Sequence, residues 1–226
     1  MRKLPGYITI LFIVLSVMPG YASWPDKTGT KLHLIDTFSS CIDSKTNLAC
    51  GWRATRKDVS MYSIVHDRGN YFVRIQSRRG NTAIGKRIDP QGAGMQFIRW
   101  RWRVHTLPAG AKESDKKKAD SGAGVYVIFK GPFKLNTILK YVWSATLPRG
   151  TVTQSPYYSR TKIIVLESGK DSLGKWVTEG VNVHDDYKRV FSAPAPKIIA
   201  IGIMSDSDNT RSLAEADYDD FILENR

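Results

Sequence analysis

Three observations predict an all-β fold, a β-sandwich or jelly roll with one short helix. Short stretches of alternating apolar and polar residues recur along the chain, and turn signals separate them at intervals of about 8–12 residues. Only His184–Phe191 has a helical pattern. The chain has 226 residues, 42% of them hydrophobic, which is enough for one domain with its own core. We find no internal repeat and no linker, so residues 23–226 are predicted to form a single domain.

The first third of the chain predicts four strands in order. Lys31–Phe38 is the first, and a loop bounded by two cysteines follows it. Met61–Val65 and Tyr71–Ser77 alternate apolar and polar residues, and the glycine and asparagine of Asp67–Asn70 between them predict a hairpin. Thr82–Ile88 is the fourth, a further short strand.

The clearest alternation lies in Gln96–His105, where isoleucine, tryptophan and valine alternate with three arginines. A period of two over this length predicts a half-buried strand. Its tryptophans are expected to pack in the core, and its outer face is expected to be basic because it carries Arg99, Arg101 and Arg103. A lysine-rich loop, Leu107–Asp120, follows this strand.

The remainder of the chain continues the pattern. Further strands are predicted at Val125–Phe129, Thr137–Trp143, Thr161–Glu167, Trp176–Asn182, Lys197–Met204 and Tyr218–Leu223. The helix at His184–Phe191 is ended by Pro194 and Pro196. Because chain termini often lie close together, we expect the first and last strands to be neighbours.

Residues 1–22 have the features of a secretory signal peptide. Arg2 and Lys3 give a positive start, Ile8–Met18 is a mainly apolar run, and small residues lead to a cleavage site after Ala22. The alternative is a membrane anchor, but a spanning helix needs about 20 apolar residues, and no later stretch of the chain has that length either. We therefore predict a periplasmic or secreted protein, with no transmembrane segment in the mature chain.

The two cysteines support the same compartment. Cys41 and Cys50 lie beyond the signal, and in an oxidising compartment such a pair is expected to form a disulfide. The alternative is a metal-binding or redox pair, but the spacing is not that of a CxxC motif and no histidine is nearby.

The net charge of +13 is informative about the partners that the protein binds and not about its fold. Outside the cytoplasm the abundant anions include acidic polysaccharides and other envelope polyanions. A basic excess can also be a solubilising surface without a specific anionic partner. Both interpretations stay open at this stage, and a nucleic-acid partner is not expected.

No catalytic signature is present in the sequence. The four histidines are scattered, and the chain contains no HExxH, no GxSxG and no phosphate-binding glycine loop. The glutamates form no close pair on one strand, whereas glycoside hydrolysis requires two carboxylates at a controlled separation. Residues far apart in sequence can still meet in space, so a non-catalytic protein is favoured and an enzyme stays an alternative.

Two clusters are candidate sites. The first lies in the acidic stretch Ser205–Asp220, where alternating side-chain oxygens resemble the first half of a calcium loop although the full EF-hand pattern is missing. The candidate calcium ligands are Asp206, Asp208, Asn209, Asp217 and Asp219. The alternative is a solvated turn rich in Asp and Asn between two edge strands.

The second cluster is aromatic and basic, a combination that stacks on sugar rings and binds acid groups. Its candidate ligand-binding residues are Lys140, Trp143, Tyr157, Tyr158 and Arg160. The same combination can also hold single-stranded nucleic acid. For Tyr126, Tyr141 and Trp143 the alternative is a place in the core.

A series of motifs resembles one bacterial family. The motifs are Arg99–Val104, Val125–Phe129 (VYVIF), Tyr141–Trp143, Ser159–Gly169, Trp176, Asn182–Val183, Asp186–Tyr187 and Ile203–Thr210. Together, from about His33 to Leu223, they resemble the family catalogued as domain of unknown function 3047. The resemblance implies an exported β-sandwich, broadly similar to carbohydrate-binding jelly rolls of the galactose-binding type. Lys140 departs from the Asn expected there, and Cys41 and Cys50 bracket an insertion.

Three hypotheses follow for function. The first is a non-catalytic protein that binds an anionic envelope or extracellular polysaccharide, with Trp143, Tyr157 and Tyr158 stacking on sugars and Lys140 and Arg160 neutralising acid groups. The second is a polysaccharide lyase or hydrolase, in which Arg160 and a neighbouring tyrosine would act on a uronate. The third is an envelope interaction module without a small ligand, docking through its arginine-rich strand.

Overall fold

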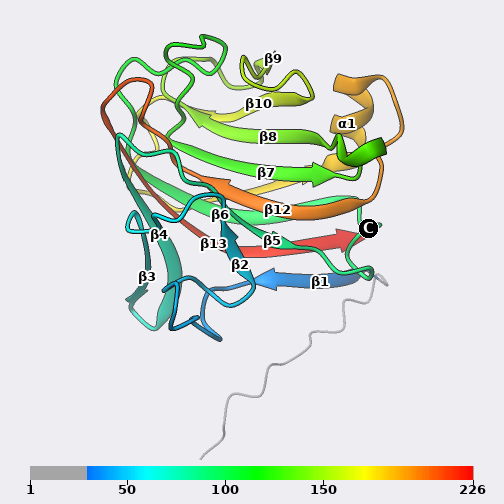
Figure 1. Cartoon of the computed structure of the whole chain (residues 1–226), viewed down its shortest axis with the longest axis horizontal. Helices are drawn as coiled ribbons and strands as arrows, with labels where there is room; N and C mark the ends of the chain where they lie inside the picture. The colour runs from blue at the N-terminus through cyan, green and yellow to red at the C-terminus, as the bar shows by residue number, and fades with distance from the viewer. Residues whose placement is uncertain (1–29, 226) are drawn as a thin grey trace, which may run out of the picture.

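The computed structural model describes residues 30–225, which form two facing β-sheets with one helix at their edge (Figure 1). The six-stranded sheet contains β1 (Lys31–Asp36), β3 (Tyr62–Asp67), β4 (Asn70–Arg78), β6 (Phe97–Thr106), β11 (Val177–Asn182) and β13 (Leu213–Asn225). Its order is β11-β6-β13-β4-β3, with β1 also paired to β13. The predicted signal peptide lies outside the described residues.

The seven-stranded sheet supplies the front layer in Figure 1. Its strands are β2 (Trp52–Ala54), β5 (Ile84–Arg87), β7 (Ala123–Phe129), β8 (Thr137–Ser144), β9 (Val152–Gln154), β10 (Thr161–Ser168) and β12 (Ile198–Met204). They are arranged in the order β2-β5-β12-β7-β8-β10-β9. A short 3-10 turn, η1 (Pro132–Lys134), and the helix α1 (Val183–Phe191) lie at one end of the sandwich.

The predicted class, a β-sandwich with one short helix, is confirmed. β3 and β4 form the predicted hairpin, and β1 pairs antiparallel with β13, as expected for the first and last strands. Two short strands, β2 and β9, were not predicted. The last strand begins at Leu213, well before the predicted Tyr218. Much of the acidic stretch is therefore strand rather than turn.

The core lies between the two sheets and is rich in aromatic side chains. Trp100 and Trp102 on β6 are fully buried, as predicted, and their rings meet edge to face with centroids 5.4 Å apart. Tyr141 and Trp143 on β8 are also fully buried, which confirms the core alternative for these two. Large aromatic rings at the centre of both sheets stabilise the sandwich by burying apolar surface.

The helix α1 begins and ends with local capping. The side chain of Asn182 accepts hydrogen bonds from the backbone N–H groups of His184 and Asp185, a typical N-cap. Ser192 ends the helix in the left-handed region. The helix covers one open end of the sandwich, because its Tyr187 ring packs 4.7 Å from Phe129.

Cys41 and Cys50 form the predicted disulfide. The bridge closes a loop with a sequence separation of 9 between β1 and β2. Closing a loop of this size stabilises a protein by about 2–3 kcal/mol through restriction of the unfolded chain. We therefore expect the Cys41→Ser/Cys50→Ser variant to unfold at lower urea concentration than the oxidised protein. Coincident urea curves for the two proteins would contradict this expectation.

Candidate functional site

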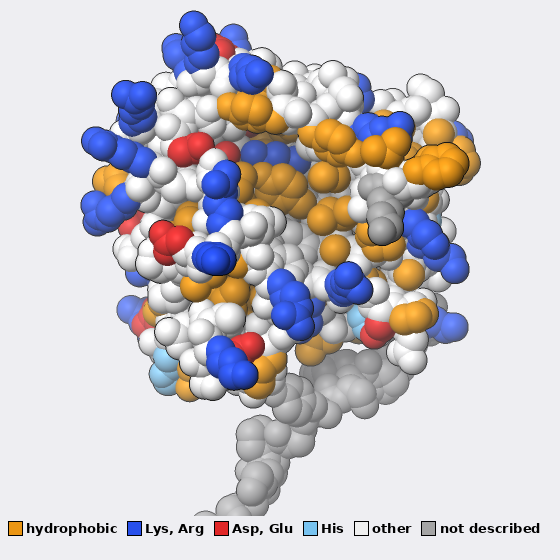
Figure 2. Space-filling model, viewed as in Figure 1, with side chains coloured by type: hydrophobic (Ala, Val, Ile, Leu, Met, Phe, Trp, Pro, Cys, Tyr) orange, Lys and Arg blue, Asp and Glu red, His pale blue; other side chains and the backbone are white. Residues whose placement is uncertain are grey.

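The outer face of the seven-stranded sheet is hollowed. Figure 2 shows a depression over the middle of this sheet, with hydrophobic side chains on its floor and Lys and Arg side chains around it. We call this depression the groove. Its floor is formed by side chains of β5, β12, β7 and β8 that point away from the core.

A row of four residues crosses the floor of the groove. Gly85 on β5 lies opposite Gly202 on β12, and Gly202 lies opposite Tyr126 on β7. Tyr126 in turn lies opposite Lys140 on β8. The residues before or after them along each strand belong to the core: Ile84, Ile203, Val125 and Tyr141. Two adjacent glycines leave this part of the floor without side chains, a feature of strands that another molecule approaches closely.

Tyr126 lies along the sheet beside a third glycine. A Cβ atom at Gly124 would be 3.5 Å from Cε2 of Tyr126 and 3.1 Å from Cε of Lys140. Both side chains therefore cover Gly124, and the Lys140 ammonium lies 5.3 Å from the centre of the Tyr126 ring. Tyr126 is half-buried, so part of its ring faces the groove.

Lys140 is surrounded by acidic and hydroxyl groups at the polar end of the groove. Its Nζ donates to Oγ of Ser121 at 3.0 Å, and only 6% of the residue is exposed. Burial alone would lower the pKa of Lys140, but Asp206, Tyr126 and Glu113 raise it above its usual value. The ammonium therefore stays charged, and its charge is already offset by protein carboxyl groups.

The acidic partners of Lys140 are themselves buried. Burial raises the pKa of Asp206 to about 7, although the Lys140 ammonium lowers it. Glu113 is fully buried, and burial raises its pKa as well. Ser144 donates a hydrogen bond of 2.6 Å to Oε2 of Glu113, whereas Oε1 has no hydrogen-bond partner among the described residues.

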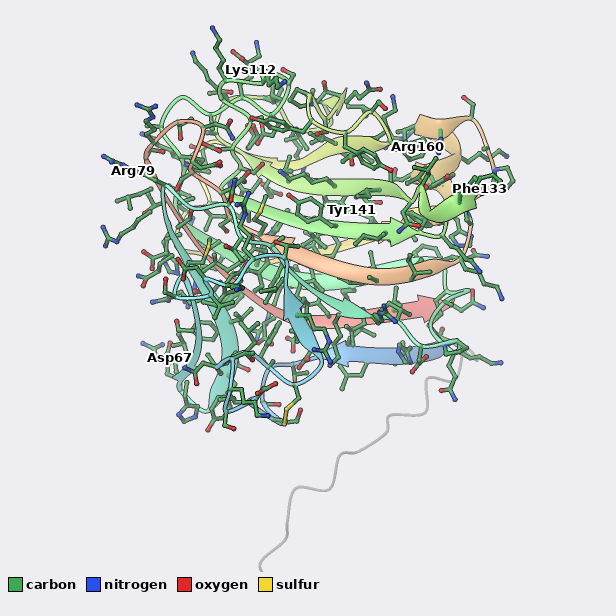
Figure 3. The ribbon with its side chains drawn as sticks, viewed as in Figure 1. Asp67, Arg79, Lys112, Phe133, Tyr141 and Arg160 are labelled. Atoms are coloured by element: carbon green, nitrogen blue, oxygen red, sulfur yellow. A yellow bond between two sulfur atoms is a disulfide. The ribbon has the colours of Figure 1, made fainter. Side chains whose placement is uncertain are left out.

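The opposite end of the groove is apolar. A cavity of about 830 Å³ lies there. Ile128, Ile199 and Ala200 of the floor line it together with Phe133, and Arg87 and Lys130 are among its other lining residues. Phe133 is 94% exposed and projects at the edge of the molecule (Figure 3). The tight turn that carries it needs Gly131, because a Cβ atom there would be 1.9 Å from the carbonyl oxygen of Leu135.

Two of the predicted ligand residues contact the two ends of the groove. Tyr157 is exposed, and its hydroxyl donates to the backbone oxygen of Lys116 at 2.7 Å and to Asn209. The Tyr158 hydroxyl donates at 2.8 Å to the backbone oxygen of Asn136, a residue of the apolar cavity. The loop that carries both tyrosines and Arg160 thus borders the groove along its β10 side.

Trp143 does not belong to this surface, so the prediction that it stacks on a ligand is wrong. Its side chain points into the core, where its ring lies 6.0 Å from that of Trp102. The reason is strand periodicity: Lys140 and Trp143 are three residues apart on β8, so they face opposite sides of the sheet.

The predicted calcium ligands are divided between two places. Asp206 and Asp208 lie together, and with Asp120 they place carboxylate oxygens within 4.8 Å of one another, as calcium ligands would be. Asn209 donates to Asp120 at 3.0 Å beside them. Ser121, Asn81 and Thr210 also donate hydrogen bonds to these three carboxylates, and calcium here stays a prediction.

Asp217 and Asp219 lie on β13, on the outer face of the other sheet, and the structure does not bring them to the acidic cluster. The strand that carries them begins at Leu213, before the predicted Tyr218, so Asp217 belongs to it as Asp219 does. Both carboxylates are engaged by arginines: Arg103 donates to Asp217 at 2.7 Å and Arg101 to Asp219 at 2.6 Å.

The arginine stripe of β6 is consequently not a free basic face. Arg99 pairs with Glu224 at 3.0 Å, and the carboxylates of β13 pair with the other two arginines. The stripe faces outward as predicted, but acidic residues of the neighbouring strand neutralise it. This removes the charge on which docking of an acidic partner to that strand depended.

A model of the family described as "Protein of unknown function (DUF3047)" matches residues 51–222. The chain belongs to this family. The match includes the groove floor, the acidic cluster and the arginine stripe, and it confirms the resemblance found in the motifs.

Solved structures that resemble this DUF3047 chain include carbohydrate-binding modules. The family 11 module of cellulosomal cellulase Lic26A-Cel5E of Clostridium thermocellum is 9% identical, with 85% of this chain and 94% of that chain covered and a TM-score of 0.44. The mannan-recognising module TmCBM27 is 8% identical, covering 87% and 98%, with a TM-score of 0.40. No curated protein matches. Because the TM-scores are low, we base the function on this chain's own residues.

Several groove residues of this DUF3047 chain were not selected from the sequence. Tyr126 was noted in the aromatic and basic cluster with the core as its alternative, but it was not chosen as a ligand residue, although it is out of phase with the buried Val125 and Val127. Strand periodicity could have placed it on the outer face. Phe133 carried no signal beyond its position after Gly131 and Pro132, because a sequence pattern does not show that a turn projects a side chain into solvent.

Proposed function

We propose that this protein binds a polysaccharide chain in the groove of the seven-stranded sheet, without catalysing a reaction. The row of Gly85, Gly202, Tyr126 and Lys140 is the observation that supports this most strongly. It combines a floor without side chains, a half-buried aromatic ring and a polar group, which suit the flat face and the hydroxyls of a sugar ring. Tyr157, Tyr158 and Arg160 border the same groove and would contact the chain from the side.

We further propose that the polysaccharide is anionic. The protein carries a net charge of +13, and Lys and Arg side chains surround the groove (Figure 2). Arg87 and Lys130 line its apolar end and have no ion-pair partner among residues 30–225. Lys140 is assigned a different role from the one expected, because its charge is offset within the protein. It would position Tyr126 and donate to sugar oxygens, while the surrounding cations would bind acid groups.

The burial of the acidic groups supports a binding protein over an enzyme. A general acid or base must reach the proton that it transfers. Glu113 is fully buried, and Asp206 is 5% exposed. Burial raises the pKa of Tyr126 to about 12, so its hydroxyl stays protonated near neutral pH and offers no phenolate to act as a general base. These groups fit a polar network that fixes the floor of the groove.

A single substitution tests the groove. We expect Tyr126→Ala to weaken binding to an acidic polysaccharide such as polygalacturonate by about 10- to 100-fold, since one aromatic platform contributes roughly 1–3 kcal/mol when it stacks on a ring. Binding is measured by affinity electrophoresis and calorimetry at physiological salt. The matched control is Tyr71→Ala, because Tyr71 is an exposed tyrosine on β4 of the other sheet.

Equal affinities of Tyr126→Ala and the wild type would show that the groove is not the binding site. The same mixtures are assayed for new reducing ends and for unsaturated sugars, which absorb in the ultraviolet. Release of either product by the wild type would replace the proposal with a hydrolase or a lyase.

We also propose that the protein works in the periplasm or after secretion. The disulfide between Cys41 and Cys50 is of a kind that persists in oxidising compartments. Within residues 30–225, no helix combines the length and hydrophobicity required to cross a membrane.

A further inference from the structure

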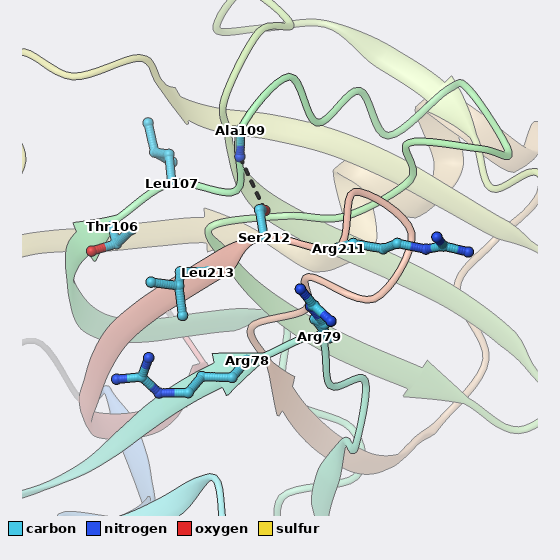
Figure 4. Close-up of a pocket in the computed structure, with 8 residues that line it drawn as sticks. All are labelled: Arg78, Arg79, Thr106, Leu107, Ala109, Arg211, Ser212 and Leu213. Atoms are coloured by element: carbon cyan, nitrogen blue, oxygen red, sulfur yellow. Dashed lines mark hydrogen bonds between the residues drawn. The ribbon is translucent and has the colours of Figure 1, made fainter.

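Three arginines surround a second cavity, outside the groove. Arg78 ends β4, Arg79 follows it, and Arg211 comes from the loop before β13 (Figure 4). The cavity has a volume of about 550 Å³ and is also lined by Thr106, Leu107, Ala109, Ser212 and Leu213. We call it the arginine pocket.

The guanidinium groups of this pocket have no protein partners. Within residues 30–225, none of Arg78, Arg79 and Arg211 makes an ion pair or a side-chain hydrogen bond, and all three are exposed. Arginines elsewhere on β4 and β6 are paired; Arg74 and Arg103, for example, both bind Asp217. Like charges at one cavity repel each other, so an uncompensated group of three indicates a ligand that supplies the negative charge.

The backbone holds two of the arginines in a sparsely populated conformation. Arg79 has φ 61° and Arg211 has φ 54°, in the left-handed region that favours glycine or asparagine. Ser207 fixes the first turn by accepting a hydrogen bond of 2.9 Å from the Arg79 N–H. Buried Asp120 fixes the second by accepting from Thr210 N at 2.7 Å. The pocket is therefore presented on preorganised turns, as strained residues at binding sites often are.

The directions of the side chains indicate the kind of ligand. In Figure 4 the side chains of Arg78 and Arg211 point to opposite sides, with Arg79 between them. This arrangement does not enclose one small anion, but it can contact successive acidic groups along a polymer. Leu107 and Leu213 add an apolar surface to the pocket, and Leu213 is 43% exposed. Sugar rings that carry acidic substituents provide both kinds of surface.

We infer that the arginine pocket binds the oxyanion groups, carboxylate or sulfate, of the polysaccharide. This rests on the proposed function, because the anions are taken to be substituents of the chain that lies in the groove. Asp206 and Asp208 at the polar end of the groove belong to the loop that leads to Arg211. A chain leaving the groove over this loop would meet the arginines next.

The test compares two variants with the same net charge. The pocket variant is Arg78→Gln/Arg79→Gln/Arg211→Gln, and the control is Lys31→Gln/Lys45→Gln/Lys188→Gln, three exposed lysines on other elements. Affinities for dextran sulfate, polygalacturonate and uncharged dextran are measured from physiological to high salt. We expect the pocket variant to lose at least about 10-fold in affinity for one or both anionic polymers, and the control to lose about 2-fold or less. The polymer with the larger loss identifies sulfate or carboxylate.

Each result decides between the two proposals. Equal losses in the pocket and control variants would mean that net charge alone acts, and this would overturn the arginine pocket while leaving the groove untouched. A wild type that binds no anionic polysaccharide at physiological salt would overturn both. Single-stranded DNA is included as a further probe; if the pocket variant loses affinity only for DNA, the pocket serves a nucleic acid and the inference is wrong.

Discussion

Replacing Asp217 with asparagine is expected to lower the free energy of unfolding by about 3–5 kcal/mol, the usual cost of breaking a buried charge cluster from one side. The Asp217 side chain is fully buried and accepts hydrogen bonds from Arg74 at 2.6 Å, Arg103 at 2.7 Å and His105 at 2.8 Å. Asparagine keeps the shape but removes the carboxylate that Arg103 binds and the nearer of the two that Arg74 faces, since Glu215 lies 3.7 Å from Arg74. The expected fall is visible as a lower urea midpoint and melting temperature.

The matched control is Asp220→Asn. Asp220 pairs with Arg101 at 2.8 Å, but its side chain is 44% exposed, and exposed pairs contribute only about 0–1 kcal/mol. If the two variants were equally stable, the buried cluster would not be a main source of stability. A folded Asp217→Asn protein should also keep its affinity for polysaccharide, since Asp217 lines neither the groove nor the arginine pocket.

Low pH is expected to weaken the ion-pair cluster around Asp217. Burial alone would raise the pKa of Asp217, but hydrogen bonds from His105, Arg74 and Arg103 hold it at about 2, below the usual 3.8. Because its pKa is depressed, the ionised Asp217 carboxylate contributes stability that is fully present above pH 3.8 and is lost as the pH falls through 2. Asp217→Asn should therefore lose less stability than the wild type over this acidic range.

The sequence predicted the sandwich because strand periodicity is a local property. Ile98, Trp100 and Trp102 reveal their common face within a few residues, and the structure buries all three. The missed strands β2 and β9 have three residues each, too few for a period to be visible. The start of β13 was missed because Glu215 and Asp217, which precede the predicted strand, resemble a polar turn. Their place in a strand depends on arginines more than a hundred positions away.

The candidate site was predictable only in part. Lys140, Tyr157 and Tyr158 were selected by residue type, and the structure places them in or beside the groove. The residues that shape the floor depend on register across four strands, which no single segment contains. Gly85 and Gly202 form a continuous floor only because the pairing of β5 with β12 places them opposite each other.

A buried glutamate is expected to make the stability of the protein fall as the pH rises from 4.5 to 7. Glu179 on β11 is 7% exposed, and its Oε1 has no hydrogen-bond partner among the described residues. Burial, with a smaller effect of Glu167, raises its pKa from 4.5 to about 7, although Arg149 opposes the change. The folded protein therefore holds this proton more tightly than the unfolded chain does. The stability that protonated Glu179 contributes is fully present below pH 4.5 and is lost as the pH rises through 7.

Glu179→Gln is accordingly expected to be as stable as the wild type near pH 4 and more stable at pH 8. The gain at pH 8 should be about 3–3.5 kcal/mol, since each pH unit between 4.5 and 7 represents about 1.4 kcal/mol. Urea unfolding at pH 4, 6 and 8 measures it. Glu167→Gln is the control, because it removes the repulsion between Glu167 and Glu179 but leaves Glu179 buried. This variant should still lose most of the stability that the wild type loses between pH 4.5 and 7. If the stability of Glu179→Gln fell with rising pH as steeply as that of the wild type, another group would cause the pH dependence. Asp206 would be tested next, because burial also raises its pKa to about 7.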